Sequence, residues 1–165
     1  MKKAAEMFLA LAAALLLLAS CAPARSNVSM YDLSRKMLEA GESLSSMKYV
    51  SSEDKEKETL FSSVSSMDYS KVDSFFISYA ESGKGNADEI VVIAVKNTAD
   101  VPEAEQSLRD HLAYRRSLYA SYDRGQLSKL DSAEVAVYGD LVSLIVADDS
   151  RGIRRAFEEY MKEAH

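Results

Sequence analysis

An unbroken run of six apolar residues, from Ile90 to Val95, constrains the fold of this chain more than any other feature. Strands with one face in water alternate apolar and polar side chains, so such a run predicts a strand covered on both faces, in the middle of a sheet. Residues 75–80 alternate with a period of two, which predicts a second strand just before it. Turn residues at 82–86 separate the two segments, and we expect them to pair as an antiparallel hairpin.

A second hairpin is expected between residues 135 and 146. Val135 and Val137 precede the pair Gly139-Asp140, which suits a tight turn, and residues 141–146 are again mostly apolar. Two hairpins with buried strands indicate an antiparallel sheet.

Apolar residues at helical spacing predict four helices. The first starts at Met30, and a short second helix runs from a Ser52 cap to about Phe61. A long helix follows the capping-box-like segment Asp100-Val101-Pro102-Glu103. We expect one face of this helix to be buried, with either Leu118 or Tyr119, and then Tyr122, as the last residues of that face. Asp148-Asp149-Ser150 caps a last amphipathic helix, whose buried stripe contains Ile153, Phe157 and Tyr160.

The order of these elements, two helices followed by ββαββα, defines the fold class that we expect. Antiparallel strands interrupted by helices predict an α+β fold in a single small domain, residues 30–165. The sheet should have about four strands, with helices packed on one face of it. We expect this domain to be monomeric.

The N-terminus has the pattern of a processing signal, and we assign residues 1–20 to a cleaved lipoprotein signal peptide. Lys2 and Lys3 precede a 13-residue apolar run, Met7 to Ala19, which is too short to span a bilayer core. The segment Leu18-Ala19-Ser20-Cys21 resembles the lipobox of bacterial lipoproteins. That resemblance implies cleavage between Ser20 and Cys21 and attachment of diacylglycerol and palmitate to the chain at Cys21. The alternative is an ordinary secreted protein with a stray cysteine.

A lipid anchor on Cys21 places the protein at the extracytoplasmic face of the bacterial cell membrane, as part of the cell envelope. Residues 21–29 would then form the lipidated cysteine and a short tether. Two acyl chains hold a protein far more firmly than one, so the attachment should be stable. No later segment approaches transmembrane length.

Charge and composition exclude several other classes of protein. The chain has 20 basic and 26 acidic residues; without Lys2, Lys3 and Glu6 the counts are 18 and 25, a net charge of −7. Such a balance disfavours nucleic-acid binding. One cysteine and two histidines provide no framework for a zinc finger, an iron–sulfur cluster or internal disulfides. We expect no metal and no cofactor.

Several segments together resemble one known family. They are Asp88-Glu89-Ile90, the helix with Arg115-Arg116, Tyr119 and Tyr122, the segment Val137 to Val142, and a trailing Asp148-Asp149. With these the chain resembles the DUF4358 family of bacterial lipoproteins and secreted proteins, over roughly Met30 to Tyr160. The resemblance implies no biochemical function and transfers no functional residues.

A cluster of tyrosine and arginine residues on the long helix is the candidate binding patch: Tyr114, Arg115, Arg116, Tyr119 and Tyr122. Tyrosine and arginine are enriched where proteins recognise partners. Tyrosines also lie at the edge of a core on half-buried helices, and the pattern does not distinguish these cases.

Other motifs point to structure more than to catalysis. His111 is interpreted as a partly buried helix residue, and Gly83-x-Gly85 as a hairpin turn rather than a phosphate loop. Ser-x-x-Lys occurs at Ser45 and Ser52, as often as chance provides and without companion motifs. We therefore assign no catalytic residue.

Three functions remain open. The first is a non-enzymatic binding or accessory protein of the envelope, anchored in the membrane through Cys21 and acting on an envelope or extracellular partner. The second is a small hydrolase or transferase acting on cell-wall or peptide substrates. The third, a substrate-binding lipoprotein of a transporter, normally needs a longer chain. A concave pocket with acidic or hydroxyl side chains from separate elements would favour the enzyme, whereas a flat Tyr/Arg face would favour binding.

Overall fold

The computed structural model describes residues 28–81 and 85–164. The signal peptide, Ser20, Cys21 and all of the tether before Val28 lie outside these residues. The elements are α2 (Met30–Glu39), β1 (Met47–Ser51), α3 (Lys57–Ser62), β2 (Val72–Ala80), β3 (Glu89–Val95), α4 (Val101–Tyr122), α5 (Leu127–Ser132), β4 (Glu134–Tyr138), β5 (Leu141–Val146) and α6 (Ser150–Glu163).

The strands form one antiparallel sheet in the order β1-β2-β3-β5-β4. β3 lies in the middle, and all seven of its residues are buried, which confirms the prediction from the run Ile90 to Val95. The hairpin of β2 and β3 is confirmed, with Phe75 opposite Ile93. The hairpin of β4 and β5 is confirmed as well. Gly139 has a φ of +60°, a backbone conformation that glycine adopts without steric cost, and it turns the chain there.

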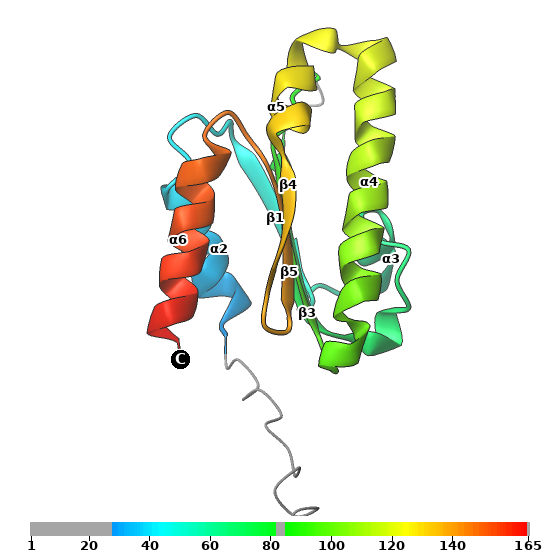
Figure 1. Ribbon diagram of the computed structural model, residues 1–165, viewed down its shortest axis with the longest axis vertical. Helices are drawn as coiled ribbons and strands as arrows, with labels where there is room; N and C mark the ends of the chain where they lie inside the picture. The colour runs from blue at the N-terminus through cyan, green and yellow to red at the C-terminus, as the bar shows by residue number, and fades with distance from the viewer. Residues whose placement is uncertain (1–27, 82–84, 165) are drawn as a thin grey trace, which may run out of the picture.

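Helices cover both faces of the sheet, so the expectation that they lie on one face is wrong (Figure 1). Phe157 of α6 and Leu33 of α2 pack with Ile90 on one face. Leu108 of α4 packs with Val91 on the other, together with α3 and α5. The cause lies in β3 and β5, whose consecutive apolar side chains point to opposite faces, so each face needs its own cover.

The sheet has five strands, one more than expected, and α5 is a further helix. The additional strand, β1, lies between α2 and α3, where no strand was expected. It pairs with β2, where Val50 lies opposite Ile77. β1 has only five residues and little alternation of apolar and polar side chains. Its extended conformation therefore depends on pairing with β2 more than on its own sequence pattern.

Two predicted helix caps differ from the structure, and a third is confirmed. α3 begins at Lys57 instead of near Ser52, and Asp54 accepts a hydrogen bond from the Ser51 amide in the turn before it. The Asp100 side chain does not cap α4; Asn97 instead caps the single 3-10 turn that leads into the helix. At α6, Asp149 accepts from the Gly152 amide, as predicted.

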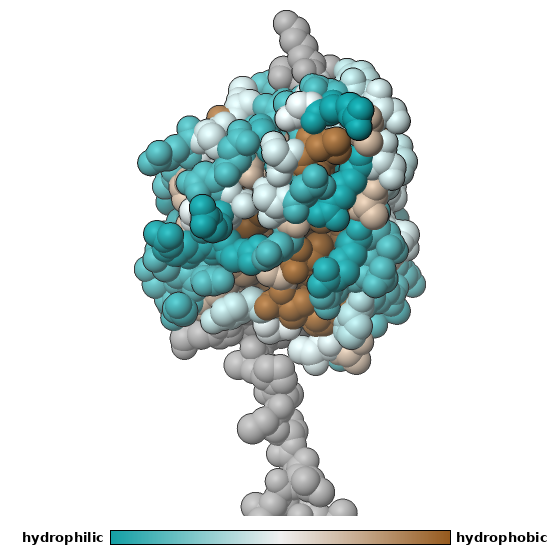
Figure 2. Space-filling model, turned by 45° about the horizontal axis from the view of Figure 1, so that its top comes forward, coloured by the Kyte–Doolittle hydropathy of each residue, from teal (hydrophilic) through white to brown (hydrophobic). Residues whose placement is uncertain are grey.

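The surface of the domain is mainly hydrophilic on the face that Figure 2 shows, with small apolar areas between charged side chains. Within residues 28–81 and 85–164, the large apolar side chains that are exposed are Tyr31, Tyr114, Leu118, Tyr122 and Val137. None of the helices in these residues is long and apolar enough to cross a membrane.

A candidate functional site between α3 and α4

A cleft of about 620 Å³ lies between α3 and α4, on the sheet. Leu60 and Val64 line it on the side of α3, Leu118 and Tyr122 on the side of α4, and Tyr79 of β2 contributes to its floor. The long helix α4 packs over β3, β5 and β4, whereas the six-residue α3 packs on β1. The surface between the two helices is therefore left partly uncovered, and we name this hollow the α3–α4 cleft.

The base of the cleft holds an ionic cluster of three side chains, which we call the Glu89 cluster. Glu89 Oε2 lies 2.8 Å from His111 Nε2 and 2.9 Å from Arg115 Nη1. The side chains of Glu89, His111 and Arg115 are only 8%, 12% and 12% exposed. The cluster joins the first residue of β3 to two consecutive turns of α4, because residues four apart share one helix face.

The Glu89 carboxylate is held in its ionised form by its two partners. Burial opposes ionisation, but the hydrogen bond with His111 and the positive charge of Arg115 outweigh it, so the pKa of Glu89 lies below its ordinary value. The Arg115 guanidinium acts on this carboxylate chiefly through its charge, and its Nη1 lies 2.9 Å from Glu89 Oε2.

The residue before Glu89 forms a second buried ion pair, the Asp88 cluster. The Asp88 side chain is 1% exposed, and its Oδ1 lies 2.8 Å from Lys129 Nζ on α5. Its Oδ2 accepts hydrogen bonds from the amide and the hydroxyl of Ser45. Burial lowers the pKa of Lys129, but the hydrogen bond with Asp88 and its charge raise it more, so the net pKa is above the ordinary value. This cluster ties α5 and the segment after α2 to the start of β3.

Tyr119 fixes the end of α4 against the segment that leads into β3. Its hydroxyl donates a hydrogen bond of 3.0 Å to the Asn86 carbonyl, and the Arg115 guanidinium lies 5.5 Å from the centre of its ring. Gly85 has a φ of +77°, and a side chain there would come within 2.9 Å of Asp123. The backbone therefore passes close to α4 at the upper end of the cleft.

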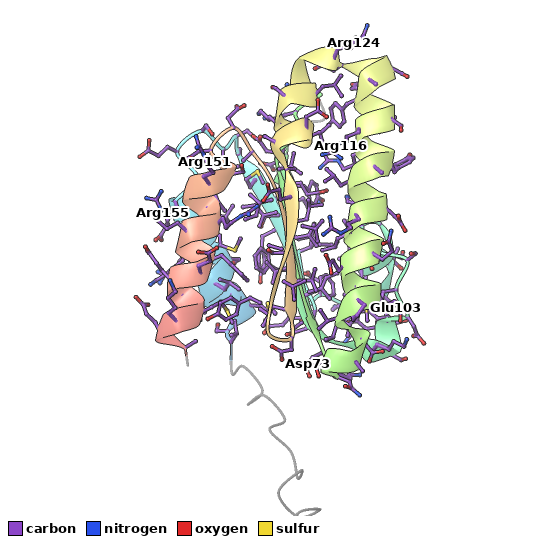
Figure 3. All side chains as sticks on the ribbon, viewed as in Figure 1. Asp73, Glu103, Arg116, Arg124, Arg151 and Arg155 are labelled. Atoms are coloured by element: carbon purple, nitrogen blue, oxygen red, sulfur yellow. The ribbon has the colours of Figure 1, made fainter. Side chains whose placement is uncertain are left out.

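The structure divides the five residues of the predicted Tyr/Arg patch among three environments. Tyr114 and Tyr122 are exposed, whereas Tyr119 is buried. Arg115 belongs to the Glu89 cluster. Arg116 points to the other side of α4, where its Nε and Nη2 donate to the Leu130 carbonyl of α5 (Figure 3). Tyr122, predicted on the buried face, is exposed, and so is its neighbour in the cleft, Leu118.

Glu89 is not among the site residues predicted from the sequence, although two sequence patterns indicate its position. Glu89 precedes Val91, Ile93 and Val95 at a spacing of two, so its side chain had to face α4 with theirs. His111 and Arg115 are four residues apart and continue the buried stripe of α4. His111 is a largely buried residue of α4, and its carboxylate partner lies on β3.

The described residues contain no group of three or more His, Cys, Asp or Glu side chains that is arranged to hold a metal ion. The Glu89 and Asp88 clusters accordingly pair their acids with arginine, histidine and lysine.

The chain is an α+β domain whose single antiparallel sheet is covered by helices on both faces. It belongs to the family described as a domain of unknown function, DUF4358, whose family model matches residues 51–147. The matched range contains both buried ion clusters except Ser45, and it excludes α2 and α6. A search of curated proteins finds no match, and neither does a search of solved structures.

Proposed function

We propose that this protein is a non-enzymatic binding protein of the bacterial cell envelope, anchored through lipid on Cys21, and that its α3–α4 cleft receives the partner. The observation that carries the proposal is the cleft itself. It stays open between two helices, while the charged groups at its base are paired with one another. A concave site lined by aromatic and aliphatic side chains with a few polar groups is the usual form of a binding pocket.

The anchor is supported by the segment Leu18-Ala19-Ser20-Cys21, which contains the only cysteine of the chain. The arrangement of the domain is compatible with it. α2 begins at the lower end of the view in Figure 1, whereas α4 ends at the upper end. The last residue of α4, Tyr122, lines the cleft. A chain held at its N-terminus would present that end of the cleft away from the lipid.

Fatty-acid labelling in bacteria tests the anchor. The wild-type chain should incorporate a labelled fatty acid, and Cys21→Ala should remain an unlabelled precursor. Label retained by the variant would contradict the anchor.

Photo-crosslinking in the same cells tests the binding role. A photoreactive residue replaces Tyr122 beside the cleft or, as the control, Tyr31, which is equally exposed on α2. We expect a partner to be captured from position 122 and not from position 31. Equal capture from both positions, or capture from neither, would contradict binding at the cleft.

A second candidate, a small envelope hydrolase or transferase acting on cell-wall or peptide substrates, is favoured by the pairing of Glu89 with His111 inside the cleft. An ionised carboxylate orients an imidazole so that it can take a proton from water. Within residues 28–81 and 85–164, no hydroxyl group is hydrogen-bonded to either member of this pair. Ser63, which lines the cleft, donates its hydroxyl to the Leu60 carbonyl instead. Turnover of wall peptides that His111→Gln abolishes, with crosslinking unchanged, would favour this enzyme over the binding protein.

A further inference from the structure

The rim of the α3–α4 cleft carries charges of both signs. Glu81 lines the cleft and is exposed, and Lys48, on the strand beside the floor, is exposed as well. At the upper end, where Asp123 lies next to Gly85, the following residue is the exposed Arg124. Within residues 28–81 and 85–164, neither sign of charge prevails around the cleft. We therefore expect an occupant without net charge.

The polar groups inside the cleft include both hydrogen-bond acceptors and donors. His111 Nε2 and Arg115 Nη1 both lie close to Glu89 Oε2, which leaves Oε1 of the carboxylate as an acceptor for a ligand. Asn86 lines the cleft, and its Oδ1 accepts from the Asp88 amide. The amide nitrogen of the Asn86 side chain is thus left as a donor. Because a hydroxyl group both donates and accepts, a ligand rich in hydroxyls can use both kinds of group.

Tyrosine rings border the same space. Tyr79 is half-buried in the floor, and Tyr122 is 65% exposed at the end of α4. The Tyr119 ring meets Tyr122 edge-on, with 6.2 Å between ring centres. The face of an aromatic ring is negative, so it attracts the weakly positive C–H hydrogens on the apolar side of a sugar ring.

On the basis of the proposed binding function, we infer that the α3–α4 cleft binds a neutral saccharide, either a free oligosaccharide or part of an envelope glycan. A sugar ring packs on Tyr122, while its hydroxyls donate to Glu89 Oε1 and accept from the Asn86 amide. The volume of the cleft, about 620 Å³, lies within the usual range of ligand pockets.

Two other occupants fit the cleft less well. An extended peptide binds most readily to a free strand edge, but β2, which forms the floor, is paired with β1 on one side and β3 on the other. An acyl chain would have to cover the polar Glu89 cluster at the base of the cleft, and hydrocarbon offers that cluster no hydrogen-bond partners.

A glycan array probed with the full chain tests the inference. The chain is purified in a detergent without a sugar headgroup, so that the detergent cannot compete. We expect neutral oligosaccharides to be retained. Because the chain contains no tryptophan, Tyr122→Trp introduces a single indole that keeps an aromatic ring at the cleft. Its fluorescence should change when the retained oligosaccharide is added. Tyr31→Trp, at a position 63% exposed on α2, is the control and should give no change.

Calorimetry with the same oligosaccharide measures the contribution of the ring. Tyr122→Ala should weaken binding about tenfold, because it removes the stacking surface, whereas Tyr122→Phe should bind nearly as the wild type does. Tyr31→Ala, the matched control, should leave the affinity unchanged. Position 122 is exposed, so these variants should fold.

Two further arms distinguish the sources of the saccharide. Co-sedimentation with isolated cell-wall glycan, freed of its peptides, would assign an envelope glycan. Binding of the free oligosaccharide without co-sedimentation would assign a soluble saccharide.

Several results would overturn the inference: retention of charged oligosaccharides alone, retention of none, unchanged affinity of Tyr122→Ala, or an equal fluorescence response from position 31. Crosslinking from position 122 in cells is independent of these readouts. If it captures a polypeptide while no saccharide binds, the binding function stands and only the saccharide class is wrong. If both experiments fail, the binding function falls with it.

Discussion

Arg115 and Arg116 are neighbours in the sequence, yet they lie on opposite flanks of α4 and serve different contacts. Arg115 pairs with the buried carboxylate of Glu89 on β3, and Arg116 donates two hydrogen bonds to the Leu130 carbonyl on α5. Consecutive residues on a helix are about 100° apart, so a pair of arginines cannot face one surface together. The two arginines of the predicted Tyr/Arg patch are therefore divided between the cleft and the contact with α5.

These different contacts predict that replacing Arg115 lowers the free energy of unfolding more than replacing Arg116 does. Arg115→Met leaves a buried carboxylate without its cation and should lower the free energy of unfolding by about 3–5 kcal/mol. Arg116→Met removes hydrogen bonds at a half-exposed site and should cost about 1 kcal/mol. Urea unfolding followed by circular dichroism measures both. Equal losses would show that Arg115 and Glu89 are not coupled in the way the distances indicate.

The depressed pKa of Glu89 predicts a specific loss of stability in acid. A carboxyl whose pKa is lower in the folded state than in the unfolded chain stabilises the fold fully above its ordinary pKa, which is 4.5 here. That contribution disappears as the pH falls below this value and through the folded-state pKa. Glu89→Gln should therefore show a shallower decline in unfolding free energy below about pH 4.5 than the wild type.

Glu81→Gln is the control for that measurement, because Glu81 is exposed. Its curve of unfolding free energy against pH should follow the wild type. If the Glu89→Gln curve runs parallel to the wild type through the acid range, the carboxylate is not held in its charged form by His111 and Arg115.

Phe157 lies in the contact between α6 and the sheet, so truncating its side chain should strongly lower the free energy of unfolding. This side chain is buried with Ile90 and Leu141, and the Tyr138 ring meets it edge-on at 6.1 Å between ring centres. Phe157→Ala should cost about 3–5 kcal/mol, a severe loss for a domain of typical stability, about 5–15 kcal/mol. Glu158→Ala, which empties no core site, should stay within about 0.5 kcal/mol. A neutral Phe157→Ala combined with loss of crosslinking would make α6 a recognition element.

A fragment from Ser26 to His165 should fold without its anchor as a monomer. Both faces of the sheet are covered by helices of the same chain, so no partner is needed to bury β3. Circular dichroism should show the helices and strands, and sedimentation should show one copy. A disordered fragment would contradict the single-domain interpretation, and folding that depends on concentration would indicate an obligate oligomer.

Local patterns along the chain were sufficient for the parts of this fold that neighbouring residues define. The run Ile90 to Val95 predicted the central strand, Gly139-Asp140 predicted a hairpin turn, and Asp149 predicted a helix start, all as found. In each case the residues that make the structure lie within a few positions of one another. An unbroken apolar run, the backbone freedom of glycine and a capping oxygen act in the same way in any surrounding protein.

The remaining features of the fold and the candidate site depend on contacts between residues that are far apart in the sequence. β1 is a strand because β2 offers it hydrogen bonds, and the helices lie on two faces because β3 and β5 present apolar side chains to both. Glu89 on β3 is 22 residues from His111, the nearer in sequence of its two partners on α4. A buried charge is stable only where the fold brings an opposite charge within a few ångströms, and no local pattern specifies that distance. The candidate site is therefore formed by tertiary packing. The strands and turns that support it are specified by local sequence patterns.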